Sequence, residues 1–110
     1  AEEVAAYDAP YPDVTYKAGV RRFPELVPDN VDAGGAKLSR AARDWFNNEW
    51  QGQTFMAVGM QDPVLGPPAM AYLKKQIRNC PDWLAVEEGG HFVQENGVEV
   101  ATAALVAFGD

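Results

Sequence analysis

Two short apolar runs, each followed by a polar residue that can do chemistry, constrain the fold of this chain most. Residues 53–60 are almost continuously apolar, which is typical of a strand buried on both faces, and Asp62 follows them. A weaker apolar run at residues 83–87 precedes a pair of glycines and His91. Functional side chains of open parallel sheets lie beyond the carboxyl ends of the strands. The pattern therefore predicts that Asp62 and His91 meet, with the Asp orienting a general-base His.

The segments around these runs have helical patterns. Residues 38–50 carry apolar side chains at spacings of three and four, with Ser39 as the expected N-cap. Arg40 and Asp44 lie one turn apart, where they are expected to pair. Two prolines end the following loop and suit the first turn of a helix to about Arg78, and residues 97–108 predict a last helix. Helices that alternate with strands indicate an α/β fold with parallel strands.

A sheet of only two parallel strands has two open edges and needs more cover than these helices give. We therefore expect the strands to be the end of a longer sheet, and the chain, which begins at Ala1 without a Met, to be a fragment. Upstream of residue 37 we expect only helical pieces and loops. Residues 1–7 are compatible with a helix, and a short helix at 15–22 is expected to break at Phe23 and Pro24.

Composition excludes several classes of function. The chain has 110 residues, 47% of them hydrophobic, which fits one soluble globular domain. A net charge of -7 argues against nucleic acid as a partner, and no apolar run approaches the roughly 20 residues that cross a membrane. One Cys and one His offer neither an internal disulfide nor a metal cluster of usual spacing, so Cys80 is expected to be a packed thiol. We expect no cofactor and no metal, and the lone Cys favours the cytoplasm.

Several longer motifs resemble one enzyme family. Residues 53–62 read QTFMAVGMQD, and they are followed by LGP at 65–67, NCP at 79–81 and GHFVQE at 90–95. Together these motifs resemble the C-terminal part of haloalkane dehalogenases, which have the α/β-hydrolase fold. Upstream, residues 9–13 and 18–24 are similar to the end of the helical cap domain of that family. The resemblance implies that residues 1–36 end the cap, and that residues 37–110 hold the last parallel strands and flanking helices of the main domain.

The resemblance also implies a mechanism. In that family an Asp nucleophile displaces halide from carbon to form an alkyl-enzyme ester, and a His activates the water that hydrolyses the ester. It gives His91 the role of base and Asp62 the role of its orienting acid. The partners implied are a small halogenated alkane, water and halide, and a monomeric enzyme is expected. The positions that match the family's apolar substrate pocket are Phe23, Pro24, Val27, Val64 and Leu65.

The family's nucleophile has no counterpart in this chain. That Asp lies on an earlier strand–turn–helix elbow and is followed by a Trp that helps to hold the halide, and no residue here offers such an elbow. We therefore expect the N-terminal part of the same enzyme as a partner. Two alternatives stay open: an epoxide hydrolase of the same fold, for which cap tyrosines such as Tyr7, Tyr11 and Tyr16 would matter, and an incompetent fragment that only binds or assembles.

Overall fold

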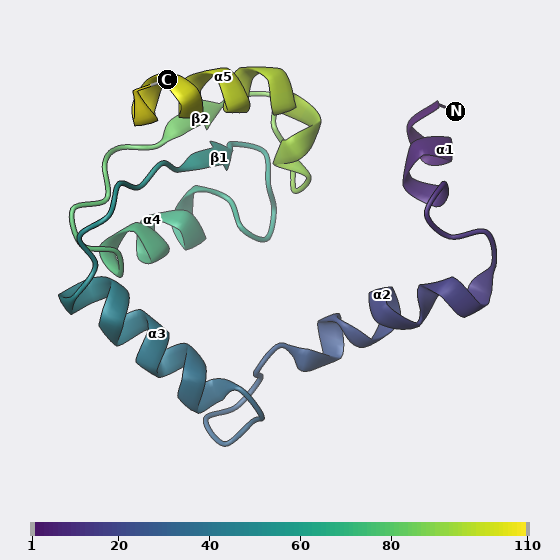
Figure 1. Ribbon diagram of the computed structural model, residues 1–110, viewed down its shortest axis with the longest axis horizontal. Helices are drawn as coiled ribbons and strands as arrows, with labels where there is room; N and C mark the ends of the chain where they lie inside the picture. The colour runs from purple at the N-terminus through teal and green to yellow at the C-terminus, as the bar shows by residue number, and fades with distance from the viewer. Residues whose placement is uncertain (1, 110) are drawn as a thin grey trace. The chain divides into compact units, whose positions relative to one another are not determined.

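The structure, a computed structural model, describes residues 2–109 of the chain. The chain divides into two compact units, Ala1–Arg40 and Ala41–Asp110. Figure 1 traces the elements of both units in chain order. The assignment of residues 1–36 to a cap domain and of residues 37–110 to a main domain stays a prediction.

The first unit contains helical pieces and loops, and no strand lies within its described residues. Asp13 starts the second helical piece, because its Oδ1 atom accepts hydrogen bonds from the backbone N–H (2.8 Å) and the hydroxyl (2.6 Å) of Thr15. The chain leaves the third piece at Phe23, and Pro24 opens a new 3₁₀ turn, so the predicted break is found there. The pieces are α1 (Glu2–Asp8), η1 (Val14–Lys17), α2 (Ala18–Arg22) and η2 (Pro24–Leu26).

The long helix α3 (Ala36–Asn48) begins three residues before the predicted N-cap. Gly35 has a φ of 87°, a left-handed conformation that glycine adopts without strain, and the helix starts directly after it. Ser39 lies inside the helix, where its N–H donates to the Gly35 carbonyl oxygen at 2.9 Å, so the N-cap prediction is wrong.

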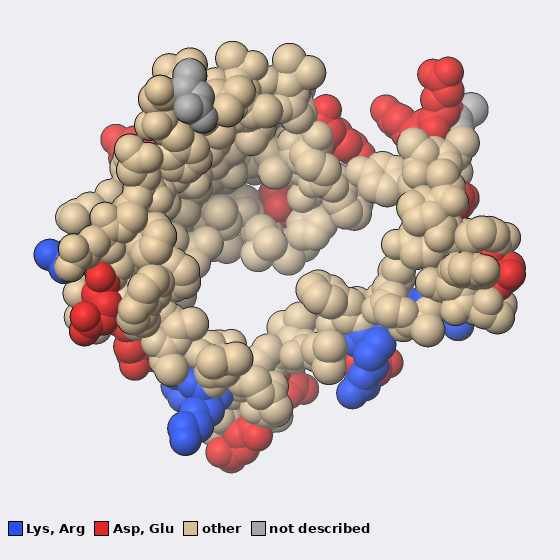
Figure 2. Space-filling view, viewed as in Figure 1, with Lys and Arg blue, Asp and Glu red and all other residues tan. Residues whose placement is uncertain are grey.

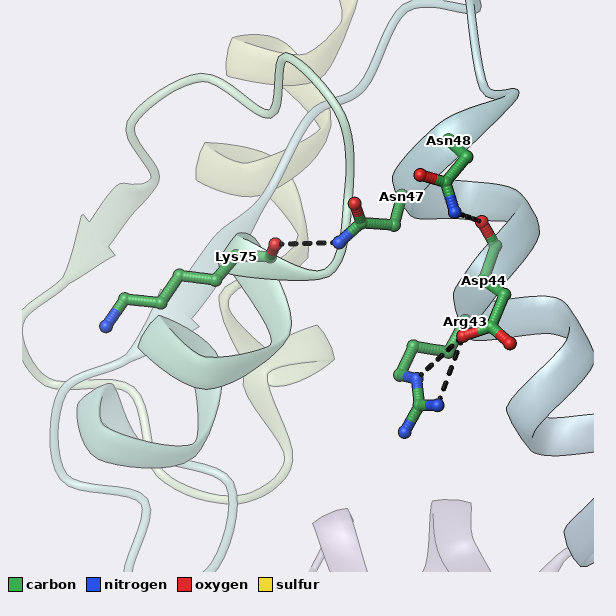
Figure 3. A network of polar contacts seen from close by, with 5 residues as sticks. All are labelled: Arg43, Asp44, Asn47, Asn48 and Lys75. Carbon is green, nitrogen blue, oxygen red and sulfur yellow. Dashed lines mark hydrogen bonds and ion pairs between the residues drawn. The ribbon is translucent and has the colours of Figure 1, made fainter.

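The predicted pair between Arg40 and Asp44 is also wrong. A guanidinium nitrogen of Arg40 donates to the Val31 carbonyl oxygen at 3.0 Å, in the loop before the helix. Asp44 instead accepts from its neighbour Arg43 at 3.1 and 3.2 Å (Figure 3). The spacing of residues along the helix could not predict these partners. The loop before α3 brings the Val31 carbonyl group to Arg40, and the helical pattern of the sequence holds no information about that loop.

The second unit holds the predicted pair of parallel strands. β1 (Ala57–Gly59) pairs with β2 (Leu84–Val86), with Ala57 opposite Leu84. Both strands are shorter than the apolar runs that predicted them, because only three residues of each run pair with the other strand. Val58 and Val86 are each 1% exposed, which agrees with strands that are covered on both faces.

Helices flank the strand pair. The connection from β1 to β2 contains α4 (Pro67–Lys75), and β2 leads through the 3₁₀ turn η3 (Val93–Asn96) into α5 (Gly97–Phe108). In Figure 1 the strands lie between α4 and α5. The bounds predicted for α5 are confirmed. The helix α4 ends three residues before the predicted Arg78, and the chain then turns at Asn79, whose φ is 56°.

Polar contacts join the end of α3 to the end of α4. The side-chain amide of Asn47 donates to the Lys75 carbonyl oxygen at 3.3 Å (Figure 3). Arg78 adds two bonds, from its backbone N–H to the Phe46 carbonyl oxygen (3.0 Å) and from its guanidinium to the Asn48 carbonyl oxygen (3.2 Å). Carbonyl groups at a helix C-terminus have no partner within the helix, so these donors stabilise the end of α3.

Few side chains are fully buried. Among the described residues, the buried hydrophobic ones are Ala36, Met56, Val58 and Val86. Large apolar side chains on α5 stay exposed, including Val98, Leu105 and Val106. In Figure 2 the surface over α5 shows mainly uncharged residues. No helix in the described part of the chain is both long and apolar enough to cross a membrane.

Candidate active site

The two polar residues that follow the strands meet, as the sequence predicts. Asp62 lies in the turn after β1, and His91 lies 29 residues further along the chain, after β2. The Nδ1 atom of His91 is 3.1 Å from Oδ1 and 3.0 Å from Oδ2 of Asp62. The Asp62 side chain is 6% exposed and that of His91 is 44% exposed. The acid is therefore covered, while the imidazole is open to other molecules.

Asp62 is held by the turn that it begins. Its Oδ1 atom accepts hydrogen bonds from the backbone N–H groups of Val64 (2.7 Å) and Leu65 (2.9 Å). An Asp that bonds the backbone two residues ahead is a common way to stabilise a turn. The carboxylate therefore has a fixed orientation, independent of His91.

Opposing influences act on the pKa of Asp62. Desolvation is the largest single influence and favours the neutral acid, but the N–H groups of Val64 and Leu65 and the His91 imidazole favour the carboxylate. The net result is that the pKa of Asp62 lies below its ordinary value of 3.8. Asp62 is thus ionised at neutral pH, as an acid that orients a histidine must be.

Backbone contacts join the two turns that carry these side chains. The Met60 N–H donates to the Val86 carbonyl oxygen at 3.0 Å, which extends the strand pairing by one bond. The Gln61 N–H donates to the Gly89 carbonyl oxygen at 2.9 Å. Glycine at position 89 lets the two backbones approach this closely. The residue before Asp62 is therefore tied to a residue two positions before His91.

The arrangement can activate a nucleophile. A carboxylate beside Nδ1 stabilises the tautomer in which Nδ1 carries the proton and donates it to Asp62. In that tautomer the Nε2 atom of His91 has its lone pair and can take a proton from water or a hydroxyl group. The negative charge of Asp62 then stabilises the imidazolium that forms.

The residues predicted to line a substrate pocket are distributed over both units. Phe23, Pro24 and Val27 lie around η2 in the first unit, where Pro24 and Val27 line a surface hollow. Val64 and Leu65 lie in the second unit, in the turn after Asp62. All five are exposed. Their contact with a substrate stays a prediction.

Sequence reasoning missed one residue beside the pair. The side-chain amide of Gln61 donates to the Glu87 carbonyl oxygen (3.1 Å) and to a carboxylate oxygen of Glu88 (3.2 Å). Its place directly before Asp62 was the available signal, but a glutamine in a turn has no periodic pattern that would mark it. For metals, the described residues contain no group of three or more His, Cys, Asp or Glu side chains that could hold an ion.

Comparison with known proteins shows which proteins the chain is similar to. No family model matches the chain. Haloalkane dehalogenase 1 of Mycobacterium tuberculosis is 38% identical over 103 residues, which are 92% of this chain and 34% of that protein. Haloalkane dehalogenase DpaA from Paraglaciecola agarilytica NO2 has a solved structure with 52% sequence identity and a TM-score of 0.87, covering 94% of this chain and 35% of that one. The chain is a homologue of the C-terminal part of haloalkane dehalogenases.

Other haloalkane dehalogenases give the same result. The enzyme of Psychrobacter cryohalolentis is 33% identical over 108 residues, 96% of this chain and 35% of that protein. The chain spans about a third of the length of the curated relatives it matches. The α/β-hydrolase fold expected from the resemblance is confirmed by the likeness to DpaA. The solved structure of DpaA is described as tetrameric.

Proposed function

We propose that this chain supplies the water-activating half of a haloalkane dehalogenase active site. His91 acts as the general base and Asp62 orients it and stabilises its charged form. The observation that carries this proposal is the pair of distances, 3.1 and 3.0 Å, between Nδ1 of His91 and the two carboxylate oxygens of Asp62. The N-terminal part of the same enzyme supplies the nucleophilic Asp and the groups that hold the halide.

The reaction has two steps. First, a carboxylate oxygen of the nucleophilic Asp attacks the carbon that bears the halogen, and the carbon–halogen bond breaks with its electron pair leaving as halide. Second, Nε2 of His91 takes a proton from water while the water oxygen attacks the carbonyl carbon of the ester. The alkoxide that leaves takes the proton from His91 and becomes the alcohol. The carboxyl group that remains carries the other proton of the water and releases it, which restores the nucleophilic carboxylate. The products are an alcohol, halide and a proton.

Apolar side chains suit such a substrate. Phe23, Pro24, Val27, Val64 and Leu65 are proposed to surround a small halogenated alkane and to keep bulk water from it. In this proposal residues 1–36 end the cap domain and residues 37–110 end the main domain. Phe23 (74% exposed) and Val64 (66% exposed) are accessible to a bound molecule, as this role requires.

The test uses the whole natural protein that contains this chain together with the N-terminal part proposed above. This protein is called the complete enzyme below. Incubation with a short bromoalkane should release bromide continuously from the wild type. His91→Gln should release bromide only once per active site and then stop, because the ester forms but its hydrolysis has no base. Mass spectrometry of that variant should show the enzyme with one added alkyl group.

Three results would contradict the proposal, in whole or in part. Opening of an epoxide without any bromide release would assign the site to an epoxide hydrolase of the same fold. No turnover of either substrate by the wild type would favour a chain that only binds or assembles. Continued turnover by His91→Gln would remove His91 from the mechanism while leaving the dehalogenase assignment intact.

Assembly and location are part of the same proposal. We propose a cytoplasmic enzyme, which the single Cys supports, since reduced thiols are usual there. The sequence predicts a monomer, whereas DpaA is described as a tetramer. Light scattering of the complete enzyme decides between these two states.

A further inference from the structure

The side chain of Gln61 connects the two turns that carry the acid and the base. Its Nε2 atom donates to the Glu87 carbonyl oxygen at 3.1 Å and to a Glu88 carboxylate oxygen at 3.2 Å. Gln61 directly precedes Asp62, and Glu87 and Glu88 are the last residues before the glycine pair that leads to His91. A single carboxamide therefore joins the segment of the acid to the segment of the base.

The glycine pair explains why such a connection matters. Gly89 and Gly90 separate the end of β2 from His91, and glycine has more accessible backbone conformations than any other residue. His91 is itself 44% exposed, so packing covers only part of its side chain. Its position on Asp62 then depends on contacts that fix the backbone just before the glycines. The Gln61 side chain makes one such contact, with the Glu87 carbonyl oxygen, and a second bond with the side-chain carboxylate of Glu88. The Gln61 N–H donates to the carbonyl oxygen of Gly89, the first glycine of the pair.

We propose that Gln61 is a positioning residue for the water-activating step, holding the turn of His91 so that Nδ1 stays on the carboxylate of Asp62. This inference rests on the dehalogenase function proposed above. Gln61 acts through His91 and touches neither the substrate nor the nucleophile. It should therefore affect the hydrolysis of the ester and not its formation.

Three variants of the complete enzyme test whether Gln61 acts by donating hydrogen bonds or only by filling space. Gln61→Met keeps the length of the side chain and removes both donors. Gln61→Lys keeps a flexible donor that can reach the same carbonyl and carboxylate oxygens, with an ion pair to Glu88 in addition. Glu88→Gln is the matched control, because it removes a charge at the same place but keeps an acceptor for Gln61.

Rapid-quench kinetics with a bromoalkane measure the two steps separately. Gln61→Met should slow hydrolysis of the alkyl-enzyme about tenfold, since a misplacement of a catalytic group by about 1 Å can cost about 100-fold and the shift expected here is smaller. The rate and amplitude of the first bromide release should stay at the wild-type values. Gln61→Lys and Glu88→Gln should hydrolyse the ester at close to the wild-type rate.

The signals of the His91 imidazole give a readout that does not need turnover. In ¹⁵N-histidine spectra of the complete enzyme these signals are identified by their absence from His91→Gln. The wild type should show a slowly exchanging Nδ1 proton bound to a carboxylate, and Gln61→Met should broaden or lose this proton. Gln61→Lys should restore it.

Each outcome bears on the proposal. Equal slowing of both steps, or a smaller bromide burst, would mean that Gln61 only supports the fold, and this would overturn the positioning role. Unchanged hydrolysis in Gln61→Met would overturn it as well. If the wild type releases no bromide, the function proposed above fails, and the Nδ1 proton then decides alone: its survival in Gln61→Met overturns the role, and its loss supports it.

Discussion

Gly59 and Gly89 contact each other through their backbones. A Cβ atom built on Gly89 would lie 3.1 Å from the Cα atom of Gly59. A Cβ atom on Gly59 would lie 2.7 Å from the Gly89 carbonyl oxygen and 2.4 Å from that of Gly90. Both distances to oxygen are shorter than side-chain carbons tolerate. The end of β1 and the turn before His91 are therefore as close as two backbones can come.

The first prediction follows from this contact. Gly59→Ala should push the turn of His91 away from β1 and lower the free energy of unfolding of the complete enzyme by about 1–3 kcal/mol, the usual cost of overpacking. It should also slow ester hydrolysis, because the same displacement separates His91 from Asp62. Urea denaturation and rapid-quench kinetics measure the two effects.

Gly90→Ala is the control for this variant. A Cβ atom on Gly90 would meet no atom within 4 Å. Its stability should therefore stay near that of the wild type. A loss as large as that of Gly59→Ala would show that the loop needs glycine for its conformation, and the close contact at Gly59 would not be the cause.

The second prediction concerns the charge of Asp62. Asp62→Asn keeps the size of the side chain but presents an amide to Nδ1, which favours the wrong tautomer of His91 and leaves its charged form without a counter-ion. The same Asp-to-Asn change lowers the kcat of a serine protease by about 10⁴-fold, and we expect hydrolysis of the alkyl-enzyme to fall by a similar factor. Bromide release in the first turnover should persist.

Asp82→Asn is the matched control, since Asp82 forms an exposed ion pair with Lys74 away from the candidate site. It should hydrolyse the ester like the wild type. Hydrolysis by Asp62→Asn at the rate of this control would contradict the role of Asp62.

The third prediction is a loss of stability in acid. Desolvation opposes the charge of Asp62, but hydrogen bonds from Val64, Leu65 and His91 outweigh it and keep the pKa of Asp62 below 3.8. The unfolded chain then binds a proton at higher pH than the native chain does. The stabilisation is present in full above pH 3.8, and it is lost as the pH falls through the lower pKa of the folded state.

Urea denaturation of the wild type and of Asp62→Asn, at several pH values below 5, measures this contribution. The difference in unfolding free energy between the two proteins should shrink as the pH falls. A difference that stays constant with pH would mean that the carboxylate gains nothing from its partners in the folded state.

The fourth prediction concerns the join between α3 and α4. Asn47→Ala removes the bond to the Lys75 carbonyl oxygen and should cost about 0.5–1.5 kcal/mol of unfolding free energy. Asn48→Ala removes a bond to the Asp44 carbonyl oxygen within the same helix and serves as the control. Thermal unfolding should show the larger loss for Asn47→Ala, and the reverse order would contradict a stabilising contact between the helices.

The fifth prediction concerns Cys80, which sequence reasoning expects to be a packed thiol. Partial burial raises the pKa of Cys80, against a smaller opposite effect of the charge on Lys74. Since the thiolate is the reactive form, Cys80 should react with iodoacetamide more slowly than free cysteine does at pH 8. Mass spectrometry follows the reaction, and a rate above that of free cysteine would refute the expectation.

The part of the fold that could be predicted is the part with a simple pattern of apolar residues along the chain. The helix at 97–108 has a helical period and the run at 53–60 is continuously apolar, and both elements were found, the strand over Ala57–Gly59 only. The meeting of Asp62 and His91 followed from one rule about the ends of parallel strands. Local rules therefore placed the acid and the base.

The errors have a common physical cause. The start of α3 depends on the left-handed conformation of Gly35, and the partner of Arg40 depends on a loop that returns to the helix. The role of Gln61 depends on the approach of two turns that lie far apart in sequence. None of these contacts leaves a period in the chain, so they could be seen only after the backbone had been placed.

The parallel pairing of β1 and β2 has a consequence for how this chemistry is inherited. Asp62 and His91, with the contacts that hold them, lie within one continuous stretch from β1 to the turn after β2. A single recombination event that exchanges this stretch would carry the base, its acid and their spacing together. Related enzymes that exchange this stretch would exchange the proposed acid–base pair together with Val64 and Leu65, so part of the proposed substrate pocket would move with it while the nucleophile stayed.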